Sequence, residues 1–308
     1  MFPVTFLSHT ASNSEPETRP AGMLESGLTR PRIRLLAIDI DGTLLDTKAE
    51  LPPRNRAALE AAHHAGVEVV LVTGRRFAFA LPVAQLLPFE VILVASNGAV
   101  IKSSGGETYY RRLLPLETAV RALELTRQWR DYTVLAYDVD GPGQLVLEGI
   151  GKRTPGFQAW LERNRQFVVY APLEEALRSR PEPPLQVMYS GPVAPLREVE
   201  GALLASPLAS SFQLMKTEYE WRDLSIVDII SRGCSKGDGL RRWAERRGIG
   251  REEVMAVGDN FNDREMLEFA GLPVVMGNAV GDLLSNGWAV TGHCDQAGLA
   301  EAIERWLL

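Results

Sequence analysis

The chain has 308 residues, and 45% of them are hydrophobic, which is enough to fill the cores of two domains of about 100–200 residues each. Its 33 lysines and arginines stand against 39 aspartates and glutamates, so the net charge is −6. Because this charge comes without a long basic run, the composition argues against a nucleic acid or an anionic membrane as partner. We therefore expect small-molecule partners, and the oligomeric state stays open.

The chain contains only two cysteines, Cys234 and Cys294, which lie far apart in the sequence. This usage argues against a disulfide framework or a structural zinc site, and it favours a reducing, cytoplasmic location. No apolar stretch approaches the roughly 20 residues that a membrane helix needs.

Residues 1–31 begin with a short apolar segment that lacks a basic region, and they continue with many Ser, Thr, Pro and Glu residues. This pattern is a poor secretory signal, and we expect a mobile N-terminal extension. Met23 lies shortly before the first predicted strand and offers a second start position, so the sequence leaves open whether the first 22 residues belong to the native protein.

From residue 33, short apolar runs alternate with helical stretches. Strands are predicted over 33–38, 67–72 and 91–95, and a helix over 52–66. Pro52 and Pro53 lie at the start of this helix, where a missing N–H is tolerated, and Gly66 lies just past its end. Because the strands are continuously apolar rather than alternating, they indicate a parallel sheet buried on both faces.

Residues 106–222 have a different pattern, in which helical stretches alternate with strand pairs joined by turn residues. We interpret this segment as an α+β domain inserted into an α/β domain made of residues 32–105 and 223–308. Within it, Asp138 and Asp140 precede a Gly-Pro-Gly turn between two β-rich runs, which favours a hairpin tip over a substrate contact.

The alternating pattern returns near the C-terminus. Helices are predicted over 235–248 and 262–271, and strands over 253–259, 272–277 and 288–292. Leu299, Ile303 and Trp306 then recur at helical spacing. We expect the two outer blocks of the chain to form halves of one sheet.

Polar residues follow several of the apolar strands. Asp39 and Asp41 end the first one, and later strands end in Thr73-Gly74-Arg75, in Ser96-Asn97-Gly98 and in residues 258–263. Because parallel strands end at one edge of a sheet, these groups should share a crevice there. An EF-hand is excluded, since the loop after Asp39 lacks the required later ligands and glycine.

Four aspartates, Asp39, Asp41, Asp259 and Asp263, would repel one another in such a crevice unless a divalent cation were bound. An all-oxygen ligand set selects a hard ion such as Mg²⁺. A dication beside carboxylates, small hydroxyl and amide donors and a lysine is typical of phosphoryl transfer, with one carboxylate as the nucleophile.

Four segments resemble, in order, the four motifs of the haloacid dehalogenase (HAD) superfamily: D-x-D-G-T-L-L at 39–45, T-G-R at 73–75, S-K-G at 235–237 and G-D-x-x-N-D at 258–263. The insertion between the second and third motifs resembles the class IIB cap of the Cof-type phosphatases. The resemblance extends from about residue 33 to the end of the chain. It implies a Rossmann-like parallel-sheet core with an inserted α+β cap domain.

The resemblance also implies roles for these residues. Asp39 would be the nucleophile and a metal ligand, and Asp41 would be the general acid and base, with its carbonyl on Mg²⁺. Asp259 would complete the metal shell, and Asp263 would hold Lys236 or metal-bound water. The expected phosphate- and substrate-binding residues are Ile40, Thr73, Gly74, Arg75, Asn97, Lys236 and Asn262.

Other polar and aromatic residues have simpler interpretations. The cap residues that we consider as substrate contacts are Asp138, Lys216, Glu218 and Arg222. His63 and His64, near the end of a predicted helix, favour a solvated or packing role. Cys234 is expected to be a packed residue, and Trp243 and Trp306 are core candidates.

We therefore expect a Mg²⁺-dependent phosphohydrolase of small phosphomonoesters, sugar phosphates or related metabolites, that works through an aspartyl-phosphate. A phosphomutase of the same superfamily and a non-catalytic phosphometabolite sensor are the alternatives.

Overall fold

A computed structural model describes residues 32–149, 155–220 and 223–308. The predicted N-terminal extension, including Met23, and the cap candidate Arg222 lie outside the described residues. Among the described residues, no helix combines the length and the apolar character that crossing a membrane requires.

The first sheet has eight strands in the order β14-β13-β12-β1-β2-β3-β4-β5. They are β1 (Leu35–Ile38), β2 (Glu68–Val72), β3 (Ile92–Ala95), β4 (Val100–Ser103), β5 (Thr108–Arg111), β12 (Val254–Gly258), β13 (Leu272–Val275) and β14 (Ala289–Val290). Strand β1 pairs in parallel with both β2 and β12. The two outer blocks of the sequence therefore form one sheet, as predicted, and only β4 runs in the reverse direction, since it pairs antiparallel with both β3 and β5.

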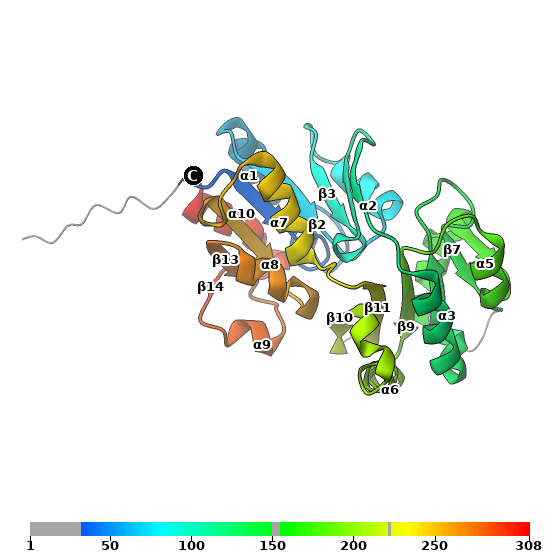
Figure 1. Cartoon of the computed structure of the whole chain (residues 1–308). Helices are drawn as coiled ribbons and strands as arrows, with labels where there is room; N and C mark the ends of the chain where they lie inside the picture. Colours follow the sequence, from blue (N-terminus) through cyan, green and yellow to red (C-terminus); the bar gives the residue numbers. More distant parts are fainter. Residues whose placement is uncertain (1–31, 150–154, 221–222) are drawn as a thin grey trace, which may run out of the picture. The chain divides into compact units, whose positions relative to one another are not determined.

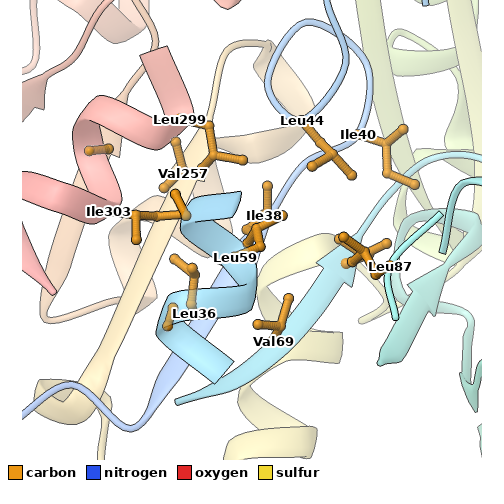
Figure 2. Close-up of a cluster of buried hydrophobic side chains, with 14 of the residues drawn as sticks. Leu36, Ile38, Ile40, Leu44, Leu59, Val69, Leu87, Val257, Leu299 and Ile303 are labelled. Carbon is orange, nitrogen blue, oxygen red and sulfur yellow. The ribbon is translucent and has the colours of Figure 1, made fainter. Parts of the chain in front are cut away.

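Helices cover both faces of this sheet (Figure 1). They are α1 (Pro53–His64), α2 (Phe77–Ala84), α7 (Lys236–Arg247), α8 (Arg264–Phe269), α9 (Gly281–Leu284) and α10 (Gly298–Trp306). On one face Leu36 and Ile38 of β1 pack in a cluster with Leu59 of α1 and Leu299 and Ile303 of α10 (Figure 2).

On the other face Leu35 and Ala37 pack with Leu240 and Trp243 of α7. Successive residues of β1 thus enter opposite cores, which confirms a strand buried on both sides. Burial of each large apolar side chain contributes roughly 1.5–3 kcal/mol. Trp243 is a core residue, as expected, whereas His63 lies exposed near the end of α1 with its ring 4.1 Å from that of Phe89.

The second sheet has six strands in the order β10-β11-β9-β6-β7-β8. They are β6 (Thr133–Ala136), β7 (Leu145–Leu147), β8 (Val168–Tyr170), β9 (Gln186–Gly191), β10 (Phe212–Tyr219) and β11 (Leu224–Ser231). The helices of the same segment are α3 (Leu116–Leu125), which precedes β6, and α4 (Pro155–Arg163), α5 (Leu173–Ser179) and α6 (Val193–Leu204), which lie between the strands in sequence. This is the α+β cap that the sequence predicts, and β6 and β7 form the antiparallel hairpin expected around Asp138 and Asp140.

Two strands belong to a different sheet from the one that the predicted boundaries of the inserted segment assign to them. Strand β5 pairs with β4 in the first sheet, although its residues fall within 106–222. Strand β11 pairs with β9 and β10 in the second sheet, although its residues follow 222. Apolar strands of this length do not reveal their partners locally, because pairing depends on distant residues. The division into domains stays a prediction.

Candidate active site

The carboxyl edge of the first sheet opens onto a cavity of about 1340 Å³. The predicted site residues that line it are Asp39, Asp41, Gly74, Arg75, Lys236, Asp259 and Asn262. Four others, Ile40, Thr73, Asn97 and Asp263, are buried directly behind this lining. The structure therefore brings residues from all four motifs to one place.

Lys236 occupies the centre of the cluster. It is the first residue of α7, where the hydroxyl of Ser235 accepts a hydrogen bond from the Asp238 N–H at 3.0 Å. Its Nζ lies 2.6 Å from Asp39 Oδ1 and 2.6 Å from Asp263 Oδ1. Burial lowers the pKa of this ammonium, but the two carboxylates outweigh burial and hold the pKa above its ordinary value.

Close backbone contacts fix the position of α7. A Cβ at Gly98 would lie 2.0 Å from the Ser235 carbonyl oxygen, and one at Gly237 would lie 2.6 Å from the backbone of Glu265. A Cβ at Gly239 would lie 2.4 Å from a methyl group of Val94. Helix α7, which carries Lys236, therefore packs against α8 and against the segment from β3 to Gly98 at distances that only glycine permits.

Two aspartates at this edge carry raised pKa values. Burial raises the pKa of Asp39 to about 7, although Lys236 opposes this. Burial, reinforced by the charges of Asp39 and Asp263, raises the pKa of Asp259 well above its ordinary value. Crowded carboxyl groups of this kind are stabilised by a bound cation.

The donor set fits Mg²⁺. One carboxylate oxygen each from Asp39, Asp259 and Asp263 lies within 4.8 Å of the others. Both oxygens of Asp263 already have partners, because Oδ1 accepts from Lys236 and Oδ2 accepts from the N–H groups of Asp259 and Asn260 at 2.9 Å. Asp39 and Asp259 are thus the side chains with capacity for a hard cation.

Asp41 and Arg75 form a separate pair at the side of this cluster. Arg75 donates from Nε to Asp41 Oδ2 at 2.7 Å and from Nη2 to Oδ1 at 2.5 Å. The Asp41 side chain is 43% exposed, whereas that of Arg75 is 14% exposed. The fork-shaped contact orients Asp41 toward the cavity and engages Arg75, which the sequence assigned to phosphate or substrate.

Asn97 and Asn262 begin a hydrogen-bond chain toward the second sheet. Asn262 Nδ2 donates to Asn97 Oδ1 at 3.0 Å, and Asn97 Nδ2 donates to Asp228 Oδ2 at 3.1 Å. Asn97 has a left-handed backbone (φ 51°), which places its amide between the other two. Burial raises the pKa of Asp228 to about 7.

Of the cap residues considered as substrate contacts, Glu218 lines the cavity, whereas Asp138 and Lys216 do not. Glu218 lines the cavity and accepts from Arg197 Nη2 at 2.6 Å. Asp138 lies outside the lining and forms ion pairs with Lys102 at 2.9 Å and Arg111 at 3.0 Å.

Lys216 is also outside the lining and pairs with Glu200 at 3.1 Å. Cys234, which also lies outside the cavity, is a buried free thiol whose pKa burial raises.

Sequence reasoning missed several residues of the site. Asn260 holds the backbone of Glu218 through two hydrogen bonds of 3.2 Å, and Asp228 and Gln186 line the cavity from the second sheet. A signal for Asp228 was present, since it is the one charged residue in the apolar strand of residues 224–231.

Comparison with known proteins agrees with this arrangement. A sequence model of the haloacid dehalogenase-like hydrolase family matches residues 36–303. The chain is 30% identical over 303 residues to the phosphatase YwpJ of Bacillus subtilis, with 89% of this chain and 100% of that protein covered. It is 31% identical over 252 residues to the pyridoxal phosphate phosphatase YbhA of Escherichia coli, with 80% and 88% covered.

Solved structures are similar over the same extent. A haloacid dehalogenase-like hydrolase from Bacteroides thetaiotaomicron has a TM-score of 0.73 at 29% identity, with 89% of this chain and 99% of that chain covered. One from B. subtilis has a TM-score of 0.74 at 27% identity, with 88% and 99% covered. The fold class and the resemblance predicted from the sequence are thereby confirmed. The chain belongs to the haloacid dehalogenase-like hydrolases and is a phosphatase of the Cof type.

Proposed function

We propose that this protein hydrolyses small phosphomonoesters in a Mg²⁺-dependent reaction that passes through an aspartyl-phosphate. The observation that carries the proposal is the buried cluster of Asp39, Lys236 and Asp263, which adjoins a cavity large enough for a metabolite. A carboxylate held 2.6 Å from an ammonium at the end of a strand is a positioned nucleophile beside a positive charge.

In the first step an oxygen of Asp39 attacks phosphorus, and the bond between phosphorus and the leaving oxygen breaks. Lys236 offsets the negative charge of the phosphoryl oxygens, while Asp263 holds the ammonium in place. Bound Mg²⁺ would neutralise further phosphoryl charge, held by Asp39, Asp259 and the carbonyl of Asp41. The groups proposed to donate hydrogen bonds to the phosphoryl oxygens are the N–H groups of Ile40 and Gly74, the hydroxyl of Thr73 and the amide of Asn262.

Asp41 is the proposed proton carrier. It gives its proton to the leaving oxygen, so that an alcohol departs, and it then accepts a proton from the water that attacks the aspartyl-phosphate. Inorganic phosphate leaves and the Asp39 carboxylate is restored. The partial exposure of Asp41 supports this role, because the carboxyl group stays within reach of water. The fork contact with Arg75 orients the carboxylate form, which is the form that accepts a proton from the attacking water.

We propose a small phosphorylated metabolite as the substrate. Relatives of this chain are named for pyridoxal phosphate, for HMP-PP and for 5-amino-6-(5-phospho-D-ribitylamino)uracil. A cytoplasmic location is part of the proposal, and it is supported by two buried cysteines that remain free thiols.

The test is phosphate release from a panel of phosphomonoesters, measured with Mg²⁺ and with a chelator. Metal-dependent release from the wild type but not from Asp39→Asn supports the proposal, and Asp140→Asn in the β6–β7 turn is the matched control. Conversion of a hexose 1-phosphate to its isomer without free phosphate would favour a mutase. No turnover by a folded, metal-loaded sample would contradict the proposal.

A further inference from the structure

One face of the second sheet forms the far wall of the cavity. On β9, Val187 and Tyr189 pack with the helix cluster of α3, α5 and α6, whereas Gln186 and Met188 face the other way, into the cavity. The cavity-lining residues of β6, β7, β9 and β11 are Ala136, Leu145, Gln186, Met188, Leu224, Ile226 and Asp228. This four-strand part of the wall is largely apolar, and Trp160 of α4 adds an aromatic ring to it, whereas β10 contributes the polar Thr217, Glu218 and Tyr219 beside it.

Asp228 is the only charged residue among these lining residues of the four strands. It is 4% exposed, and it accepts hydrogen bonds from the neutral amides of Asn97 at 3.1 Å and Gln186 at 3.0 Å. Burying a carboxyl group on an apolar surface without a cation beside it destabilises the folded protein. A functional role for Asp228 would account for this cost.

Gln186 provides a second, independent observation. Its Nε2 donates to Asp228, but its buried Oε1 has no hydrogen-bond partner among the described residues. Gln186 is only 2% exposed, yet it belongs to the lining of the cavity, so a group bound there can approach this oxygen. An unpaired buried acceptor beside a cavity is satisfied when a ligand brings a donor.

The pair lies close to the place where the phosphoryl group would bind. A single amide, that of Asn97, stands between Asp228 and Asn262, which lines the cavity next to the motif residues. The leaving group of an ester bound there would therefore approach Gln186 and Asp228 while its body lies on the apolar wall.

We propose that Gln186 and Asp228 are specificity-determining residues that accept hydrogen bonds from a flat, largely apolar ring bearing N–H or O–H donors. The inference rests on the proposed phosphatase function and names its substrate class. A polyol fits the apolar strands β6, β7, β9 and β11 poorly, because hydroxyl groups that face them would lose water without finding a partner. A ring without donors would leave the acceptors unpaired, which disfavours it strongly.

Three esters test this assignment: pyridoxine 5′-phosphate, a ring with hydroxyl donors; benzyl phosphate, a ring without them; and glucose 6-phosphate, a polyol. We expect the wild type to have a kcat/KM for pyridoxine 5′-phosphate at least about tenfold above the other two. Gln186→Met should reduce the ratio of pyridoxine 5′-phosphate to benzyl phosphate by about tenfold. Gln213→Met, the same substitution on β10 away from this cavity, should keep the ratio.

An unchanged ratio in a folded Gln186→Met variant, or a preference for glucose 6-phosphate, would overturn the assignment. An equal loss for all three esters in Asp228→Asn would instead assign Asp228 to positioning Asn97, and would also overturn it. Inhibition of the wild type by free alcohols needs no variant: pyridoxine should inhibit about tenfold more strongly than benzyl alcohol, and equal inhibition contradicts the inference. If the wild type hydrolyses no ester at all, the proposed function itself fails.

Discussion

Asp39 and Asp228 are both buried carboxyl groups whose pKa burial raises to about 7, yet the protein holds them in opposite ways. Asp39 has the Lys236 ammonium at 2.6 Å, whereas Asp228 has two neutral amides. The first arrangement suits a group that must be an anion when it reacts. The second suits a group that exchanges hydrogen bonds with a neutral partner. The difference matches the two roles that we propose, phosphoryl chemistry on one sheet and recognition of the leaving group on the other.

The largest expected effect comes from removing the charge of Asp39. Asp39→Asn should lower phosphate release by more than about 1000-fold, because an amide is a poor nucleophile. Circular dichroism should show an unchanged fold. Normal turnover by the variant would contradict the assignment of Asp39 as the nucleophile and would remove the proposed difference between Asp39 and Asp228.

The next effect concerns the cation that distinguishes the two acids. Lys236→Met should abolish turnover and lower the free energy of unfolding by roughly 3–5 kcal/mol, because the buried carboxyl groups of Asp39 and Asp263 would lose the ammonium that pairs with both. Urea denaturation measures the loss. Adding Asp39→Asn to this variant should recover part of the stability, and a purely additive loss would argue against the coupling.

A smaller effect is expected from the fork between Arg75 and Asp41. Arg75→Lys keeps the charge but loses the two-point contact, so we expect kcat to fall by about 10- to 100-fold with little change in unfolding free energy. Arg241→Lys, which alters surface ion pairs on α7, is the control and should leave kcat unaffected. Equal kcat values for the two variants would contradict the inference that Arg75 positions Asp41.

The smallest expected effect is the change of folding stability with pH. A folded-state pKa of about 7 for Asp39, against its ordinary 3.8, means that the metal-free folded protein keeps a proton that the unfolded chain releases. Stability of the metal-free protein should therefore fall as pH rises from about 4 to 7. Mg²⁺ should raise the melting temperature more at pH 8 than at pH 5 and should release protons on binding, which calorimetry in two buffers detects. Equal stabilisation at both pH values would contradict this.

The sequence predicted which side chains meet at the carboxyl edge of the first sheet, because that placement depends on local signals. Asp39 and Asp259 each follow an apolar strand, and parallel strands end at the same edge whatever their order. The recognition end could not be predicted in this way. Gln186 and Asp228 lie on neighbouring strands whose antiparallel register depends on residues about 40 positions apart. The same long-range dependence explains why the sheet membership of β5 and β11 differs from the predicted boundaries.

The glycine contacts of α7 have a consequence for the cost of catalysis. At Gly98 and Gly237 backbone meets backbone, and at Gly239 it meets a methyl group of the buried Val94, so little can move to absorb a displacement of the helix. The Lys236 ammonium is therefore held in place before any ester binds, and little entropy is lost in ordering it when charge develops on the phosphoryl group. A bulkier residue at any of these three positions would loosen this support without touching a single reacting atom.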